Sequence, residues 1–296
     1  MILVCGGSGF VGSHLVRQLC QDGFAVRCLV RNPVRAESLF QPGVQLVQGD
    51  ITQPASLTPA LEGVTAVINL VGIIQEAGGA TFQKIHVGGT QNLVSAAQQA
   101  GVRRFVYISA LGTRENAASR YHQSKYAAEQ LVILSGLSYT IFRPSVMYGA
   151  GGEFIRLLFD LVRGPVIPVI GRGENLMQPL YVGDLARCLS LSLSLDEVDS
   201  SIWEIAGKEP MTYFEMLRKV RNASGKGGAF IRLPLWLVRP MVRLMEGVLS
   251  RPPLTSDQLL MLQEDNVCDV DRLQGHFAIS LVEFDEWLQQ HRAGVK

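Results

Sequence analysis

Apolar runs and helical patterns alternate along the first half of the chain. Continuous apolar runs of strand length stand at residues 2–5, 24–30, 44–47, 66–71, 105–108 and 139–142. Between the later runs, apolar residues recur at helical spacing over residues 82–100 and 121–134. Strands that are apolar throughout are typical of a sheet that is covered on both faces. The alternation therefore predicts an α/β fold with a Rossmann-type, doubly wound parallel sheet.

The regular alternation ends near residue 150. Beyond it, helical patterns cover residues 154–162 and 184–195, and short strands are predicted at residues 167–170, 179–182 and 201–205. We expect residues 1–150 to form one domain and residues 151–296 a smaller lobe, with later segments completing the sheet. Such a lobe would close a cleft at the carboxyl ends of the parallel strands, where doubly wound folds bind their ligands.

Three glycines separate the first predicted strand from the first helix. Gly6, Gly9 and Gly12 follow one another at intervals of three residues. Glycine permits the tight turn, lets backbone N–H groups approach a pyrophosphate, and places the phosphate on a helix N-terminus. A turn in an α/β protein without a nucleotide is the alternative. The position directly after an N-terminal strand favours a dinucleotide-binding domain over residues 1–150.

The residue at the end of the second strand bears on the choice of cofactor. Roughly 20 residues after the turn, where NAD-binding folds place a carboxylate for the ribose hydroxyls, this chain has Arg31, followed by Arg35. A guanidinium can bind a 2′-phosphate through two hydrogen bonds, and no carboxylate is there to repel it. The pattern favours NADP(H) over NAD(H), with a solvated arginine at a strand end as the alternative.

A tyrosine and a lysine occur one helical turn apart at the start of a predicted helix. Tyr121 and Lys125 are separated by four residues and therefore share a helix face. An ammonium group beside a phenol lowers the pKa of the phenol, which would prepare Tyr121 to exchange a proton with a carbonyl or alcohol. An ordinary surface pair is the alternative.

Composition narrows the class of partner. The 296 residues include 27 Lys and Arg and 26 Asp and Glu, which gives a net charge of +1, and only 18% of the residues are charged. This leaves no surplus of positive charge for a phosphate backbone, so nucleic acid is excluded as the main partner. A hydrophobic fraction of 47% indicates a large interior or an apolar face for another molecule.

Cysteine and histidine usage indicates a reducing compartment and no metal. The five cysteines are widely spaced without a C-x-x-C pair, and the five histidines show no metal-ligand spacing. Met1 leads directly into the first apolar run, without the basic and apolar regions of a secretory signal. We therefore expect a cytoplasmic protein without a metal site.

Charge is segregated in the last third of the chain. Residues 216–251 contain eight basic residues against Glu246, and residues 257–286 contain eight acidic residues against Arg272. Residues 232–251 combine arginine with Trp, Leu and Met, which suits a peripheral contact with the inner face of an anionic membrane or with a membrane complex. The alternative is internal, with the acidic tail covering the basic segment.

Several motifs together resemble a known family. They are Gly6-Gly7-Ser8-Gly9-Phe10-Val11-Gly12, Gly49-Asp50, Asn69-Leu70-Val71-Gly72, Tyr121 with Lys125, and Arg143-Pro144-Ser145 with Tyr148-Gly149. In this order they resemble the extended and atypical short-chain dehydrogenase/reductases, which are similar to NAD-dependent epimerases and dehydratases. Later motifs at residues 178–184, 233–236 and 255–267 look like the branch related to the nucleotide-binding accessory subunit of respiratory complex I.

The resemblance implies a role for each matching residue. It implies that the turn residues Gly6, Ser8, Gly9, Phe10, Val11 and Gly12 hold the pyrophosphate, Arg31 and Arg35 the 2′-phosphate, Asp50 and Ile51 the adenine edge, Val71 and Gly72 the cofactor ribose region, Lys125 the nicotinamide ribose, and Pro144 and Ser145 the nicotinamide. Tyr121 would be the general acid/base. The substrate would lie beside the nicotinamide.

Two positions depart from the family pattern. Ala110 stands where the catalytic Ser or Thr normally lies, with Ser109 one residue early, and His86 holds a position that is often Asn. Ser109 could replace the missing hydroxyl only if the loop is shifted, and an uncompensated loss costs about 100-fold or more in rate.

Two functions follow from these features. The first is hydride transfer between NADP(H) and a small or lipidic carbonyl, an alcohol or a nucleotide sugar, with Tyr121, Lys125 and Ser109 as catalytic residues. The second is a non-catalytic nucleotide-binding accessory or assembly factor of a membrane respiratory complex. Retention of Tyr121 and Lys125 favours the first, and Ala110 favours the second.

Overall fold

The chain folds into two compact units. The computed structural model describes residues 1–195, 200–225 and 227–291, so Lys226 of the basic segment lies outside the described residues. Unit 1 comprises Met1–Arg143 and Leu185–Trp203, and unit 2 comprises Pro144–Asp184 and Glu204–Lys296. The chain thus leaves unit 1 after Arg143 and returns to it once.

A seven-stranded sheet forms the centre of unit 1. Its strands are β1 (Ile2–Cys5), β2 (Val26–Val30), β3 (Gln45–Gln48), β4 (Ala66–Asn69), β5 (Arg104–Ile108), β6 (Ser138–Pro144) and β11 (Ser201–Ile205), and the last residues of β6 and β11 belong to unit 2. The spatial order is β11-β6-β5-β4-β1-β2-β3, and all pairings from β6 to β3 are parallel. The predicted doubly wound parallel sheet is confirmed.

One strand ends earlier than its apolar pattern predicts. The run over residues 66–71 predicts a strand to Val71, but β4 ends at Asn69. The side-chain oxygen Oδ1 of Asn69 accepts a hydrogen bond from the N–H of Val71 at 3.1 Å. This local bond turns the backbone out of the ladder, as asparagine often does.

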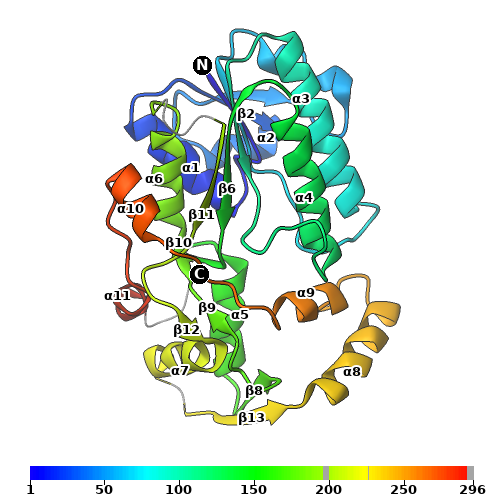
Figure 1. Cartoon of the computed structure of the whole chain (residues 1–296), viewed down its shortest axis with the longest axis vertical. Helices are drawn as coiled ribbons and strands as arrows, with labels where there is room; N and C mark the ends of the chain where they lie inside the picture. Colours follow the sequence, from blue (N-terminus) through cyan, green and yellow to red (C-terminus); the bar gives the residue numbers. More distant parts are fainter. Residues whose placement is uncertain (196–199, 226, 292–296) are drawn as a thin grey trace. The chain divides into compact units, whose positions relative to one another are not determined.

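Helices cover both faces of this sheet. Figure 1 shows α3 (Gly89–Gln99) and α4 (Arg120–Ile133) on one face and α1 (Phe10–Gln21) and α6 (Val182–Leu191) on the other. Short helical segments are α2 (Pro33–Ala36) and the 3₁₀ turns Glu37–Leu39, Pro54–Ser56 and Pro59–Leu61. The helix predicted over residues 82–100 begins with a π-helical segment, Gln83–Gly88, before α3. This segment carries the fully buried His86.

A buried ion pair joins α4 to the end of β6. The carboxylate of Glu129, which is fully buried, accepts hydrogen bonds from Arg143 Nε at 2.9 Å and from Arg143 Nη2 at 2.7 Å. A buried carboxylate without such a partner would be strongly destabilising. Arg143 therefore has a structural role, which fixes the position where the chain leaves unit 1.

The described residues of unit 2 form small sheets and six helices. The strand pairs are β7 (Met147–Tyr148) with β10 (Leu180–Tyr181), β8 (Val166–Ile170) with β13 (Ala229–Leu233), and β9 (Leu176–Met177) with β12 (Met211–Thr212). The helices are α5 (Glu153–Val162), α7 (Tyr213–Ser224), α8 (Leu235–Val248), α9 (Ser256–Met261), α10 (Asp271–Phe277) and α11 (Phe284–Gln290). Tyr148, Phe159, Met216 and Trp287 lie in its main core.

A buried glutamine connects the irregular segments of unit 2. The side chain of Gln178 donates to the carbonyl of Gly207 at 2.7 Å and accepts from the N–H of Cys268 at 2.9 Å. Asp184 likewise accepts a hydrogen bond from the N–H of Val282 at 2.8 Å. Asp184 therefore anchors the fold of this unit. Among the described residues, no helix combines the length and the apolar character needed to cross a membrane.

Candidate functional site

The glycine turn forms a closely packed cradle at the N-terminus of α1. The N–H of Gly9 donates to the carbonyl of Gly6 at 3.0 Å, and Gly6 has a φ of +86°, which favours glycine. A Cβ atom on Gly12 would lie 2.2 Å from the Gly6 carbonyl oxygen and 2.6 Å from the Cα of Gly7. Only glycine fits at position 12 in this turn.

The first turn of α1 is open to an anion. Gly9 is the N-cap residue, no side chain caps the helix there, and the first turn contains no acidic residue. The N–H groups of such a turn, together with the helix dipole, bind phosphate. Ser8 and Gly9 are exposed, whereas Phe10 and Val11 are half-buried. The turn therefore fits the pyrophosphate of a dinucleotide.

The topology places the predicted cofactor residues along one edge of the sheet. Asp50 and Ile51 follow β3, Arg31 follows β2, Gly6 follows β1, and Val71 lies just beyond β4. These four parallel strands are consecutive in the sheet, and their order reverses around β1, which is where doubly wound folds bind nucleotides. A Cβ atom on Gly6 would lie 3.3 Å from the nitrogen of Val71. The structure thus brings the turn and the β4 loop together.

The two arginines predicted to bind a 2′-phosphate are available to solvent. Arg31 and Arg35 are exposed, and Asn32 caps α2 by accepting the N–H of Arg35 at 3.1 Å. Within the described part of the chain, neither guanidinium forms an ion pair. Both positive charges are therefore free to meet an anion at the end of β2.

The predicted adenine-edge residues are held in place by neighbours that the sequence motifs do not include. The carboxylate oxygen Oδ1 of Asp50 accepts from the N–H and the hydroxyl of Thr52, each at 2.8 Å. Ile51 is buried, and its carbonyl accepts from the side chain of Asn92 at 2.9 Å. A Cβ on Gly89 would lie 2.5 Å from Ile51, so this wall is closely packed.

The amino group of Lys125 lies in a buried polar site at the end of β5. Lys125 Nζ donates to the carbonyl of Ile108 at 2.7 Å and to the hydroxyl of Tyr107 at 3.3 Å. Burial lowers the pKa of Lys125 to about 7, which the nearby carboxylate of Glu129 opposes. A Cβ on Gly72 would lie 3.6 Å from this nitrogen, so Lys125 and the predicted ribose-binding loop adjoin.

Tyr121 is half-buried among aromatic rings at the start of α4. Its ring meets those of Phe82, His86 and His122 edge-on at centroid distances of 5.8, 5.6 and 5.3 Å. Burial raises the pKa of Tyr121 to about 12. The expectation that Lys125 lowers this pKa is wrong for this structure, because desolvation of the phenol outweighs a lysine whose own charge is weakened by burial. Tyr121 therefore keeps its proton at neutral pH.

His86 is a neutral, buried member of the site. Its Nε2 accepts the N–H of Ile73 at 3.0 Å, so Nδ1 carries the proton and donates to the Ser124 hydroxyl at 2.8 Å. The Ser124 hydroxyl in turn donates to the Tyr121 carbonyl at 2.7 Å. Burial, and secondarily the charge of Lys125, lowers the pKa of His86 to about 3. This chain of bonds couples the loop after β4 to the helix that carries Tyr121.

Two hydrogen bonds hold Ser109 just after the end of β5. Its N–H donates to the carbonyl of Phe142 at 2.7 Å, which continues the β5–β6 ladder. Its buried hydroxyl lies 3.3 Å from that of Thr113 and donates to it. Ala110, by contrast, is half-exposed.

The predicted nicotinamide-lining residues are structural members of unit 2. Ser145 is buried, its hydroxyl donates to the carbonyl of Gln178 at 2.6 Å, and its N–H donates to that of Ile205 at 2.8 Å. Pro144 is the last residue of β6. The backbone at Ser145 is thus held by a hydrogen bond, and its hydroxyl already has a partner within unit 2, the carbonyl of Gln178.

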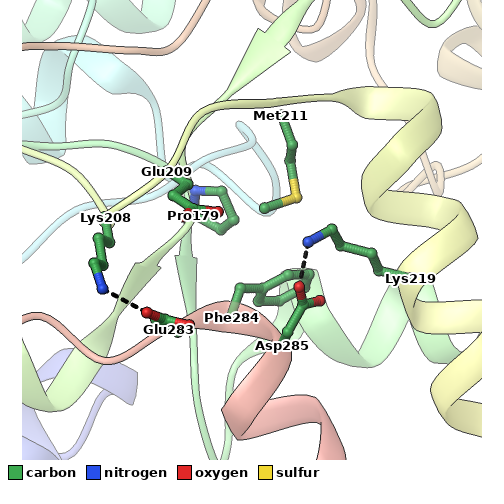
Figure 2. A pocket seen from close by; sticks show the side chains of 8 residues that line it. All are labelled: Pro179, Lys208, Glu209, Met211, Lys219, Glu283, Phe284 and Asp285. Atoms are coloured by element: carbon green, nitrogen blue, oxygen red, sulfur yellow. Dashed lines mark hydrogen bonds and ion pairs between the residues drawn. The ribbon is translucent and has the colours of Figure 1, made fainter.

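A small hollow in unit 2 contains none of the predicted site residues. Figure 2 shows it between Pro179, Met211 and Phe284. Two ion pairs cross its rim, Lys208 with Glu283 at 2.5 Å and Lys219 with Asp285. Because each lysine already faces a carboxylate, the hollow does not present a site for an anionic ligand.

The doubly wound sheet, the uncapped glycine turn at its switch point, and Tyr121 and Lys125 at the adjoining strand end define a Rossmann-type dinucleotide-binding protein. Comparison with known families agrees, because residues 6–156 match the family described as NAD(P)H-binding. The chain belongs to this NAD(P)H-binding family, within the atypical short-chain dehydrogenase/reductases that its motifs predict. Its cofactor is a nicotinamide dinucleotide.

Individual relatives have different named roles. A ceramide reductase of Caulobacter vibrioides is 31% identical over 240 residues, which are 79% of this chain and 74% of that protein. The NADH dehydrogenase [ubiquinone] 1 alpha subcomplex subunit 9 of Arabidopsis thaliana is 27% identical, over 98% of this chain and 78% of that one. The structure of an NADPH-dependent quinone oxidoreductase from Escherichia coli with NADPH shares the fold, with a TM-score of 0.76 at 20% identity, over 98% and 99% of the two chains.

The protonation state of His86 generates a prediction about stability. Because the folded pKa of about 3 lies below the ordinary value of 6.5, His86 binds a proton only after unfolding between these values. Its stabilising contribution is present above pH 6.5 and is lost as the pH falls toward 3, by about 2 kcal/mol between pH 7 and pH 5. Urea unfolding at both pH values should show this loss in the wild type and little of it in His86→Asn. An equal pH dependence in both proteins would contradict a neutral, buried His86.

Proposed function

We propose that this protein is an NADPH-dependent reductase of a carbonyl group. The observation that carries the proposal is the placement of Tyr121 and Lys125 on the first turns of α4, with the nitrogen of Lys125 beside Gly72. Bound NADPH supplies the hydride to the carbonyl carbon. The Tyr121 phenol, protonated at neutral pH, donates its proton to the carbonyl oxygen as charge develops there.

The protonation states of Tyr121 and Lys125 are compatible with a reduction. With a pKa of about 12, the phenol of Tyr121 carries its proton near neutral pH, which is the state that reduction requires, although burial makes it a weaker acid than a free tyrosine. Lys125, with a pKa of about 7, can hold the ribose hydroxyls and pass a proton toward Tyr121 after turnover. The relatives named as ceramide reductase and quinone oxidoreductase support a lipidic or small carbonyl compound as substrate.

A specific observation favours a second function. Ala110, which lacks a hydroxyl, stands where the resemblance places the family's second hydroxyl donor, and the hydroxyl of Ser109 donates to that of Thr113. A protein that binds NADPH without turning it over, as an accessory or assembly factor of a membrane respiratory complex, would need no such donor. The similarity to the NADH dehydrogenase subunit of Arabidopsis supports this alternative.

Cofactor choice is tested at the end of β2. We propose that Arg31, assisted by Arg35, binds the 2′-phosphate of NADPH. Arg31→Ala removes a charge-assisted hydrogen bond and should raise the Kd for NADPH about 10- to 100-fold while changing that for NADH little. Isothermal titration with both nucleotides measures this. Arg103→Ala, at another exposed arginine in a loop, is the control and should change neither. Equal losses for NADPH and NADH in Arg31→Ala would contradict the assignment.

Catalysis is tested by removing one oxygen atom. Purified protein is incubated with NADPH and a panel of carbonyl compounds and quinones, and the loss of NADPH absorbance is followed. Tyr121→Phe should lower kcat about 100-fold or more without weakening NADPH binding, because the proton donor is lost. Tyr126→Phe, at a half-buried tyrosine on the same helix, should retain full activity. Tight NADPH binding with no turnover by the wild type would instead support the accessory function.

A further inference from the structure

Helix α8 carries two separate apolar stripes. Leu235, Val238, Val242 and Met245 recur at steps of three and four residues, and so do Leu237, Met241, Leu244 and Val248. Because residues with this spacing share one side of a helix, the two sets lie on different sides. A helix with a single core contact needs only one such stripe.

Only the first stripe is buried. Val238 and Val242 form a small cluster with Leu259 of α9, which follows α8 in Figure 1. The second stripe faces solvent, where Leu244 is 70% and Val248 is 75% exposed, as is Trp236 at 76%. Isolated exposed apolar residues are common, but the four residues of the second stripe share one side of this 14-residue helix and form an exposed apolar patch. Around the helix, Trp236 lies between this stripe and Arg243.

The third side of α8 is positively charged. Arg239 and Arg243 are exposed, as are Arg232 before the helix and Arg251 after it. The carboxylate of Glu246 accepts from the N–H of Ser256 at 2.7 Å and from its hydroxyl at 2.5 Å, at the start of α9. Across the described residues, none of the four arginines forms an ion pair, and Arg239 donates to the neutral side chain of Gln263.

The acidic tail therefore does not neutralise this side of the basic segment. Among the described residues, its ion pair with residues 216–251 is made at α7, where Lys219 pairs with Asp285 of α11. The alternative in which the acidic tail covers the basic segment therefore holds at Lys219. The four arginines of residues 232–251 are exposed and available to an anionic partner.

We propose that α8 docks on an anionic lipid bilayer. Trp236, Leu237, Met241, Leu244 and Val248 would enter the boundary between headgroups and acyl chains, with α8 lying parallel to the surface. Arg239 and Arg243, on the flank of this patch, would extend to the phosphates. A second copy of the chain would suit the same apolar stripe less well, because a two-fold contact would bring the arginines of both copies together. This surface goes beyond the proposed function and does not depend on it.

Vesicle flotation with the full chain tests the proposal. The probes are vesicles of phosphatidylglycerol with phosphatidylcholine, and of phosphatidylcholine alone, at low salt. The wild type should float with the anionic vesicles, less so as salt is raised, and much less with the neutral vesicles. Trp236→Glu/Leu244→Glu should lower the partition coefficient about tenfold or more. Arg239→Gln/Arg243→Gln should lower it on the anionic vesicles.

A matched variant separates the α8 patch from general surface hydrophobicity. Leu134 and Leu39 are 81% and 58% exposed, and Leu39→Glu/Leu134→Glu should float like the wild type. All variants should retain the melting temperature and the NADPH affinity of the wild type, since these residues are at the surface. No flotation by the wild type, or equal flotation of the α8 and control variants, would overturn the proposal. So would a dimer seen by sedimentation that Trp236→Glu/Leu244→Glu dissociates, without binding to vesicles.

Discussion

The contact between Gly12 and Gly6 is the constraint on which the nucleotide site depends. No Cβ atom fits at position 12, so the first turn of α1 can pack directly on the turn after β1. This packing leaves the N–H groups of α1 uncapped by side chains and exposed at the point where the strand order reverses. Arg31, Asp50 and Val71 reach the same edge because β2 and β4 are parallel neighbours of β1, and β3 is the parallel neighbour of β2.

A buried polar network forms the other half of the site. Lys125, Tyr107 and His86 are all removed from water, and each has hydrogen-bond partners that define its orientation. Burial raises the pKa of Tyr121 and lowers those of Lys125 and His86, so it determines which groups carry protons at neutral pH. The site therefore keeps the phenol of Tyr121 neutral. Ala110 remains the feature that separates a reductase from a nucleotide-binding accessory protein.

The sequence predicts the sheet and the glycine turn well, because both rest on local patterns of apolar residues and glycine. Sequence patterns do not predict the features that depend on tertiary contacts. The end of β4 depends on a hydrogen bond to the side chain of Asn69. The pKa of Tyr121 depends on its burial among aromatic neighbours, and the orientation of the Ser109 hydroxyl depends on its hydrogen bond to Thr113. The role of His86 also depends on contacts with Ile73 and Ser124 that spacing does not reveal. The apolar and basic residues of α8 are visible in the sequence, but only the structure shows that one apolar stripe is buried and the other is exposed.

The central claim is that the turn between β1 and α1 binds the dinucleotide, and NADPH titration of a glycine variant tests it most directly. Gly12→Ala inserts a Cβ atom into the Gly6 carbonyl, whereas Gly275→Ala, in α10, meets no atom within 4 Å. Isothermal titration of both variants and the wild type, each checked for a cooperative melting transition, gives the affinities. We predict nanomolar to micromolar binding for the wild type and Gly275→Ala, and a loss of about 100-fold or more for a folded Gly12→Ala, because the pyrophosphate contacts are displaced. Equal NADPH affinity in all three proteins would contradict the account.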